Sequence, residues 1–209
     1  MKKRVIDMTK DPRHEQFEYF ASLTDPYAGV TCQVDITAFM ERLAQSGAPF
    51  FLAFTYEVLA VANAVPELRR RIEGDQVVEY DACRCSCTVA KPDGSYAYCT
   101  LDGTLPWAEY LAQGRKALDA ARDGGTMRED GDSGEYFFIS CVPWLRYTDM
   151  KQPLPEPAFS NVRLAWGKYA TENGRTTLPV TLVAHHALAD GIHLGAFYQE
   201  LEKRVSQNQ

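Results

Sequence analysis

The stretch "VAHHALADGIHLGAF", residues 183–197, decides how this chain folds. It holds three of the chain's four histidines, and an aspartate and a glycine stand between the second and the third. An alternating apolar run precedes the stretch, and from Leu194 onward apolar residues recur at helical spacing. The pattern therefore predicts a junction between the last strand and the last helix, where side chains project into a cleft from a backbone held rigidly on both sides.

The rest of the chain alternates helical and strand patterns without internal repeats. The dipeptides Asp93-Gly94 and Asn173-Gly174 have the composition of hairpin turns, and the polar, glycine-rich segment 122–134 is typical of a surface loop. These patterns predict a mixed β-sheet flanked by helices. The helices are expected at 36–43, 50–68, 104–122 and from 194 to 205, and the strands at 76–90, 96–100, 135–140, 163–170 and 176–184.

Length and composition exclude several classes of protein. A chain of 209 residues with 45% apolar side chains can bury a sizeable core. Its net charge of −6 provides no basic face for a phosphate backbone, which argues against nucleic acid as a partner. No apolar run reaches the ~20 residues that cross a bilayer, and no apolar segment follows the basic start. We therefore expect one domain, residues 1–209, that is soluble, cytoplasmic and not bound to a membrane.

The six cysteines are expected to be reduced thiols. Three of them form the segment "CRCSC" at 83–87, where a period of two places all the thiols on one face of a strand. Zinc ligands more often have C-x-x-C spacing, so small buried strand residues are the preferred interpretation. We expect no metal site.

Three hypotheses account for the histidine cluster. A metal site is disfavoured because His185 and His186 are adjacent and point to opposite faces of an extended strand. A purely structural hypothesis makes Asp190 the N-cap of the last helix. The third hypothesis is general base catalysis, because a neutral imidazole can take a proton from a hydroxyl or thiol that attacks a carbonyl. The residues alone leave the structural and the catalytic hypotheses open.

Several segments, in order along the chain, resemble the chloramphenicol acetyltransferase family. The motif "HHALADGIH" is similar to that family's H-H-x-x-x-D-G-[aromatic]-H signature, which also precedes the last helix. The other matching segments are "RHEQFE" (13–18), "VDITAF" (34–39), "FFLAF" (50–54), "NAVPELR" (63–69), "SCVPW" (140–144) and "WGKY" (166–169). The resemblance covers nearly the whole chain and implies an α/β two-layer sandwich of the CoA-dependent acyltransferase type.

The resemblance also implies a reaction and roles for particular residues. His186 would be the general base that deprotonates the acceptor hydroxyl as it attacks acetyl-CoA in a ternary complex, without an acyl-enzyme. Asp190 would shape the site through a pair with Arg13. Ser140 would donate a hydrogen bond to the oxyanion. Read alone, Ser140 is a serine at a strand end and Arg13 is a surface charge.

The resemblance further implies a homotrimer with active sites at subunit interfaces. Trp144, Lys168 and Tyr169 match positions along the CoA tunnel, although the two aromatic residues also suit ordinary core or edge positions. The departures from the family lie at the acceptor side of the site. Ala165 replaces an expected threonine, Ile192 an aromatic residue, Ala184 the valine that usually precedes the histidine pair, and Ala28 a pocket aromatic.

The expected function is therefore transfer of an acetyl group to chloramphenicol or a related hydroxylated small molecule. One alternative is a dihydrolipoamide acyltransferase core, which acetylates a thiol. Against it, a histidine rather than an aspartate precedes His186, and no lipoyl domain or Pro/Ala-rich linker is present. The other alternative is a non-catalytic relative that binds apolar ligands between subunits.

Overall fold

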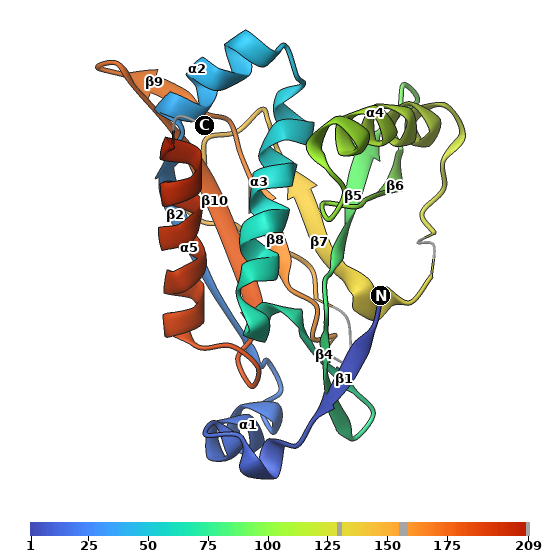
Figure 1. Ribbon diagram of the computed structural model, residues 1–209, viewed down its shortest axis with the longest axis vertical. Helices are drawn as coiled ribbons and strands as arrows, with labels where there is room; N and C mark the ends of the chain where they lie inside the picture. Colours follow the sequence, from blue (N-terminus) through green and yellow to red (C-terminus); the bar gives the residue numbers. More distant parts are fainter. Residues whose placement is uncertain (129–130, 155–158, 208–209) are drawn as a thin grey trace.

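The computed structural model describes residues 1–128, 131–154 and 159–207. A larger mixed sheet and a small antiparallel sheet are combined with helices (Figure 1). The strands are β1 (Lys3–Ile6), β2 (Tyr27–Asp35), β3 (Arg70–Glu73), β4 (Gln76–Tyr80), β5 (Arg84–Ala90), β6 (Tyr96–Leu101), β7 (Tyr136–Cys141), β8 (Arg163–Trp166), β9 (Ala170–Glu172) and β10 (Arg175–His185). The α-helices are α1 (His14–Ala21), α2 (Thr37–Ser46), α3 (Phe50–Ala64), α4 (Trp107–Gly124) and α5 (Gly191–Ser206), and the short 3₁₀ helices are η1 (Met8–Lys10), η2 (Pro66–Arg69) and η3 (Ser133–Glu135).

The larger sheet has the strand order β2-β10-β8-β7-β5-β6, and β9 pairs with β10 beside this path. The pairs β5–β7 and β7–β8 are parallel, and the other pairs are antiparallel. In Figure 1 the long helices α3, α4 and α5 all lie on the same side of this sheet. The predicted mixed sheet with a helical layer is therefore confirmed, and it has the two layers that the resemblance implies.

The core lies between the sheet and α3. The sequence of α3 is apolar on nearly all sides, and its side chains Leu52, Phe54 and Leu59 are completely buried. Burial of such a side chain contributes ~1.5–3 kcal/mol relative to exposure. Alternate residues of β10 face the same core, including Leu182, which is also fully buried. This packing holds the end of β10 rigidly, and the histidine pair lies there.

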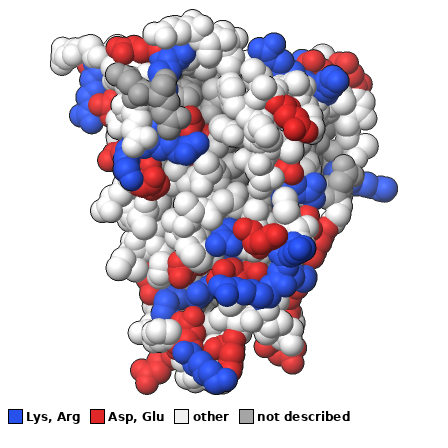
Figure 2. Space-filling model, in the orientation of Figure 1, with Lys and Arg blue, Asp and Glu red and all other residues white. Residues whose placement is uncertain are grey.

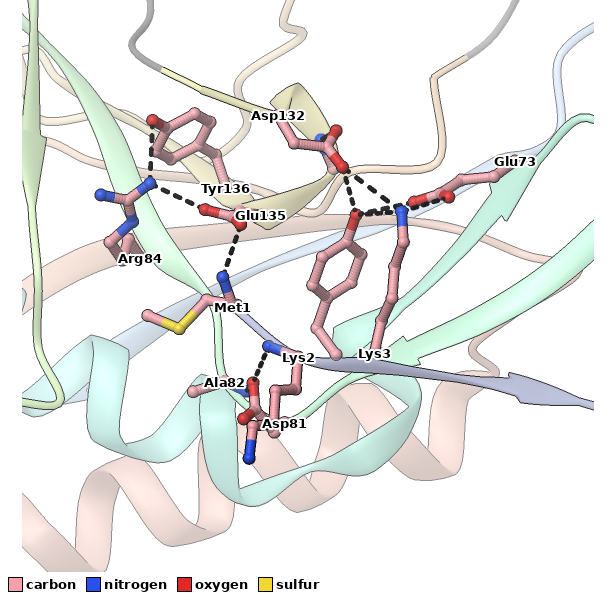
Figure 3. A network of polar contacts seen from close by, with 12 residues as sticks. Met1, Lys2, Lys3, Glu73, Asp81, Ala82, Arg84, Asp132, Glu135 and Tyr136 are labelled. Carbon is pink, nitrogen blue, oxygen red and sulfur yellow. Dashed lines mark hydrogen bonds and ion pairs between the residues drawn. The ribbon is translucent and has the colours of Figure 1, made fainter.

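The small sheet has the order β1-β4-β3 and joins the N-terminus to the middle of the chain. Figure 3 shows the polar network across its strands: Lys3 donates to Glu73 at 2.6 Å, and the Tyr80 hydroxyl lies 2.7 Å from Glu73 and 3.0 Å from Asp132, with one proton to donate between them. Charges of both signs alternate over the lower part of the face in Figure 2, and the centre of that face is mostly uncharged. This face therefore carries no extended patch of one sign.

The structure divides the predicted strand at 76–90 into two strands of different sheets, β4 and β5. The cysteines Cys83, Cys85 and Cys87 are buried, as the apolar interpretation predicts. Burial raises the pKa of the Cys83 thiol. Among the described residues, no group of three or more His, Cys, Asp or Glu side chains could hold a metal ion.

Both predicted hairpin turns are present. Asn173 and Gly174 have φ angles of 52° and 77° at the turn between β9 and β10, as a two-residue turn of this type requires.

None of the described helices is long and apolar enough to cross a membrane.

Candidate active site

Strand β10 leads into the candidate site and α5 leads out of it. At the end of β10 the backbone N–H groups of Leu188 and Ala189 donate to the carbonyl of His185, which closes a tight turn. The N–H of His186 donates to the carbonyl of Pro26 at 2.6 Å, and this bond ties the turn to the start of β2. The predicted junction of strand and helix is therefore confirmed, and hydrogen bonds fix its backbone on both sides.

Asp190 is the N-cap residue of α5, as the structural hypothesis predicts. Its backbone N–H donates to Nδ1 of His193 at 2.9 Å, and its carbonyl accepts the N–H of His193 at 2.9 Å. The carboxylate is bound elsewhere, by a guanidinium. The backbone of Asp190 thus starts the helix, and its carboxylate is free to form an ion pair with another residue.

Arg13 forms this ion pair with the Asp190 carboxylate. Its Nε donates to Asp190 Oδ2 at 2.8 Å and its Nη2 to Oδ1 at 2.6 Å, which is a bidentate ion pair. The same guanidinium donates to the carbonyls of His186 at 3.1 Å and Ala187 at 3.0 Å. Hydrogen bonds from Arg13 lower the pKa of Asp190. One arginine therefore holds the carboxylate ionised and fixes the backbone of the histidine turn.

The His186 ring lies between Asp190 and α1. Its Nδ1 is 3.1 Å from Asp190 Oδ1, and its other side stacks on the ring of Phe20, with centroids 3.7 Å apart and an interplanar angle of 5°. About a third of the side chain is exposed, at 30%. Nδ1 makes no hydrogen bond among the described residues, but the negative charge of Asp190 beside it favours a proton on this nitrogen, which leaves the lone pair on Nε2.

His185 has a different environment. It is 5% exposed and contacts Tyr27 edge to face, with ring centroids 5.6 Å apart. Burial lowers the pKa of His185 to about 4, so this imidazole is neutral at physiological pH. The two adjacent histidines therefore face different neighbours and do not converge on one point.

Ser140 lies on the internal strand β7, at the edge of the sheet that the carboxyl ends of β7 and β8 form, opposite the end that carries His186. It pairs with Ala165 across β7 and β8, and Ala165 pairs with Thr181 of β10. From Thr181 the chain continues five residues to His186, which corresponds to ~16 Å at ~3.3 Å per residue. One chain therefore does not bring Ser140 and His186 together.

The three residues expected along the CoA tunnel lie at the Ser140 edge. Trp144 follows β7 and is 73% exposed. The backbone N–H of Lys168 donates to the carbonyl of Leu145 at 2.7 Å, which joins the loops after β7 and β8. Tyr169 is 42% exposed. Because β7 and β8 are parallel, their carboxyl ends lie side by side, and an exposed aromatic and basic surface forms there.

Three of the departures from the family now have a position. Ala184 is 2% exposed and pairs with Ala28 of β2, so two small side chains face each other at the end of β10. Ile192 is 77% exposed on the first turn of α5. Its apolar side chain is unusually exposed for a residue beside a candidate site.

Sequence reasoning did not identify Phe20 or His193 as site residues. Phe20 lies on α1, which was not predicted as a helix. The signal for His193 was available, because a side chain that can accept a hydrogen bond three residues after an N-cap is the pattern of a capping box.

Comparisons with known proteins identify the family of this chain. The family model for chloramphenicol acetyltransferase matches residues 1–202. Chloramphenicol acetyltransferases from Klebsiella sp. and Escherichia coli are each 28% identical over 208 residues, which cover 95% of this chain and 92% of each relative. A solved chloramphenicol acetyltransferase structure is 27% identical, with a TM-score of 0.84 over 98% of this chain and 100% of that chain.

A more distant likeness concerns the fold alone. The cubic core of the pyruvate dehydrogenase multienzyme complex is 16% identical, with a TM-score of 0.70 over 92% of this chain and 86% of that chain. The family model and the curated relatives, in contrast, extend over almost all of the sequence. The chain belongs to the chloramphenicol acetyltransferase family.

Proposed function

We propose that this protein transfers the acetyl group of acetyl-CoA to a hydroxyl of chloramphenicol or a closely related small molecule and so inactivates the antibiotic. The observation that carries the proposal is the His186 imidazole beside the Asp190 carboxylate, which Arg13 binds in turn. Membership of the family supports the same reaction.

His186 acts as general base in this proposal. Its Nε2 accepts the proton of the acceptor hydroxyl while that oxygen forms a bond to the acetyl carbonyl carbon. The carbon–sulfur bond then breaks, and the same proton passes from the imidazolium to the CoA thiolate. Asp190 does not relay a proton, because its carboxylate is bound by Arg13 and its pKa is lowered. The reaction thus needs both substrates bound together and no acyl-enzyme.

Ser140 donates a hydrogen bond to the carbonyl oxygen as negative charge develops on it. A preorganised donor of this kind lowers the barrier by ~2.7–4 kcal/mol. Trp144, Lys168 and Tyr169 hold acetyl-CoA, which their position beside Ser140 supports. An aromatic ring suits the adenine and a lysine suits a phosphate.

The separation of His186 from Ser140 supports a shared site. We propose a homotrimer in which His186 of one subunit meets the Ser140 edge of its neighbour. A ring of three subunits closes with one such contact per interface. Each interface would then hold one complete set of residues.

The proposed location is the cytoplasm, and the proposed organisation is one domain over residues 1–209. All six cysteines are free thiols, which suits a reducing compartment. One apolar cluster contains residues from the N-terminal, central and C-terminal thirds of the chain.

The test is release of CoA thiol from acetyl-CoA with and without chloramphenicol. We expect release that depends on chloramphenicol, loss of turnover in His186→Ala, and acetyl-CoA binding by that variant within a few fold of wild type. His185→Ala is the control, because its side chain is buried against Tyr27 and its loss acts on stability. Equal loss of turnover in two well-folded variants would contradict the role of His186.

Dihydrolipoamide as acceptor tests the thiol alternative, and binding of acetyl-CoA without turnover on any acceptor would favour a non-catalytic relative.

A further inference from the structure

His193 joins the candidate site to a ring of charged groups. It is the third residue of α5, and its side chain is 17% exposed. Nδ1 accepts the backbone N–H of Asp190 at 2.9 Å, and Nε2 lies 3.9 Å from Glu67 Oε2. An acceptor nitrogen carries no proton, so the neutral ring has its proton on Nε2, the nitrogen nearer to Glu67. The two neighbours together specify one tautomer.

The contacts continue from Glu67 back to Arg13. Glu67 Oε1 is 3.6 Å from Arg70 Nη2, and Arg70 Nη1 donates to Asp11 Oδ2 at 3.1 Å. Asp11 Oδ1 in turn accepts the backbone N–H of Arg13 at 2.9 Å. Arg13 completes the ring by binding the Asp190 carboxylate. These contacts form a closed circuit that joins the start of α5 to the start of α1 and to η2. Its members are His193, Glu67, Arg70, Asp11, Arg13 and Asp190.

We propose that His193 is a positioning residue of the acetyl-transfer reaction, which must be neutral for His186 to be correctly placed. Protonation would put a hydrogen on Nδ1, and Nδ1 could then no longer accept the Asp190 N–H. The N-cap would loosen, and Asp190 Oδ1, which lies 3.1 Å from His186 Nδ1, would move with its backbone. The inference rests on the proposed function, because it assigns His193 a part in that same reaction.

Charged groups of both signs face His193. Burial has the largest effect and lowers its pKa, Glu67 and Asp190 act in the opposite direction, and Arg13 and Arg70 lower the pKa further. The result is a pKa below the ordinary value. The circuit is therefore intact at neutral pH, and it opens only on the acid side of the pH range in which free histidine titrates.

Three variants separate positioning from simple stability. His193→Asn places an amide oxygen close to the position of Nδ1 and keeps an acceptor for the Asp190 N–H. His193→Gln is the matched control, because it carries the same amide one bond further out, toward Glu67. Glu67→Gln removes the charge beside Nε2 and keeps the shape. We expect kcat within about threefold of wild type for Asn and a roughly 10- to 100-fold lower kcat for Gln, with the KM for acetyl-CoA unchanged in both.

The pH profile is the readout that a merely structural role would not move. We expect log kcat/KM of the wild type to fall more steeply on the acid side than that of His193→Asn, because protonation of His193 breaks the hydrogen bond from the Asp190 N–H only in the wild type. In Glu67→Gln the protonation of His193 should move to lower pH, because a carboxylate that favours the imidazolium is gone. Equal acid-side slopes in the wild type and His193→Asn, or equal kcat in Asn and Gln, would overturn the proposal.

A second measurement does not depend on turnover. Long-range ¹⁵N–¹H spectra of the imidazoles report the tautomer of each histidine, and we expect His193 in the Nε2–H form at neutral pH. An Nδ1–H tautomer or an imidazolium at neutral pH would refute the circuit even in an active enzyme. If the wild type acetylates no acceptor while His193 shows the Nε2–H form, the proposed function is wrong, although the hydrogen bond from the Asp190 N–H to His193 is present. The positioning role of His193 is then wrong as well, because it depends on that reaction.

Discussion

The Arg13–Asp190 pair offers a quantitative test of how this site is held. Replacement of Arg13 by methionine keeps most of the side-chain volume and removes two hydrogen bonds to the carboxylate and two to backbone carbonyls. The two side chains are 14% and 30% exposed. The pair therefore lies between an exposed pair, worth ~0–1 kcal/mol, and a buried one, whose disruption costs ~3–5 kcal/mol. We expect Arg13→Met to lower the free energy of unfolding by ~2–3 kcal/mol.

A double-mutant cycle isolates the pair itself. Asp190→Asn keeps a good N-cap residue, so its loss of stability reports mainly the missing charge. We expect a coupling energy of ~1–2 kcal/mol between Arg13→Met and Asp190→Asn. The assay is urea unfolding at one fixed protein concentration, because association adds to apparent stability. In parallel, kcat/KM should fall ~100-fold in Arg13→Met, because a displacement of the general base His186 slows the reaction. Additive effects within ~0.5 kcal/mol would refute the conclusion that the two side chains act as a unit.

Three further outcomes follow from named contacts. His185 has a folded pKa of about 4, below its unfolded value of ~6.5, so it binds fewer protons in the fold. Stability should therefore fall by ~3 kcal/mol as pH drops through this window, as urea unfolding with a His185→Gln control would show. Ser140→Ala should lower kcat ~100- to 1000-fold with little change in the KM for acetyl-CoA, measured by thiol release. Gly103→Ala should destabilise by ~1–3 kcal/mol in thermal unfolding, because its Cβ would lie 2.7 Å from Leu59.

Strong periodicity made most of the fold predictable. The apolar run before His185 predicts β10 to within one residue at each end, and the helical stripe after Leu194 predicts α5 apart from its first turn. Elements without a one-sided apolar pattern were missed. Strand β2 has exposed or half-buried residues at nearly every position, and α1 has no fully buried residue. Local periodicity carries no signal for elements of that kind.

The site required information that spacing cannot supply. Asp190 could be expected as an N-cap from its neighbours alone, because capping is local chemistry. Its partner Arg13 is 177 residues away, and only the family resemblance connected the two. The stack of Phe20 on His186 likewise depends on where α1 packs. Local sequence predicts which residues can act, and tertiary packing decides which of them meet.

The separation of His186 from Ser140 leads to a decisive test of the shared site. In the proposed trimer each site takes its base from one subunit and its oxyanion donor from the next. A His186→Ala chain keeps a functional Ser140 edge, and a Ser140→Ala chain keeps a functional His186. If the two inactive chains are co-expressed in equal amounts and assemble at random, about a quarter of the interfaces should combine the intact His186 with the intact Ser140.

Thiol release by the mixed assembly should therefore reach about a quarter of the wild-type rate, although each variant alone is nearly inactive. A site contained within one chain predicts no recovery, because every chain then lacks either the base or the donor. A mixture of separately purified variants that do not exchange subunits is the control, and it should remain inactive under both arrangements. Activity in the co-expressed sample alone would thus locate the reaction between subunits, whereas its absence in a confirmed mixed oligomer would require His186 and Ser140 to meet by a rearrangement of a single chain.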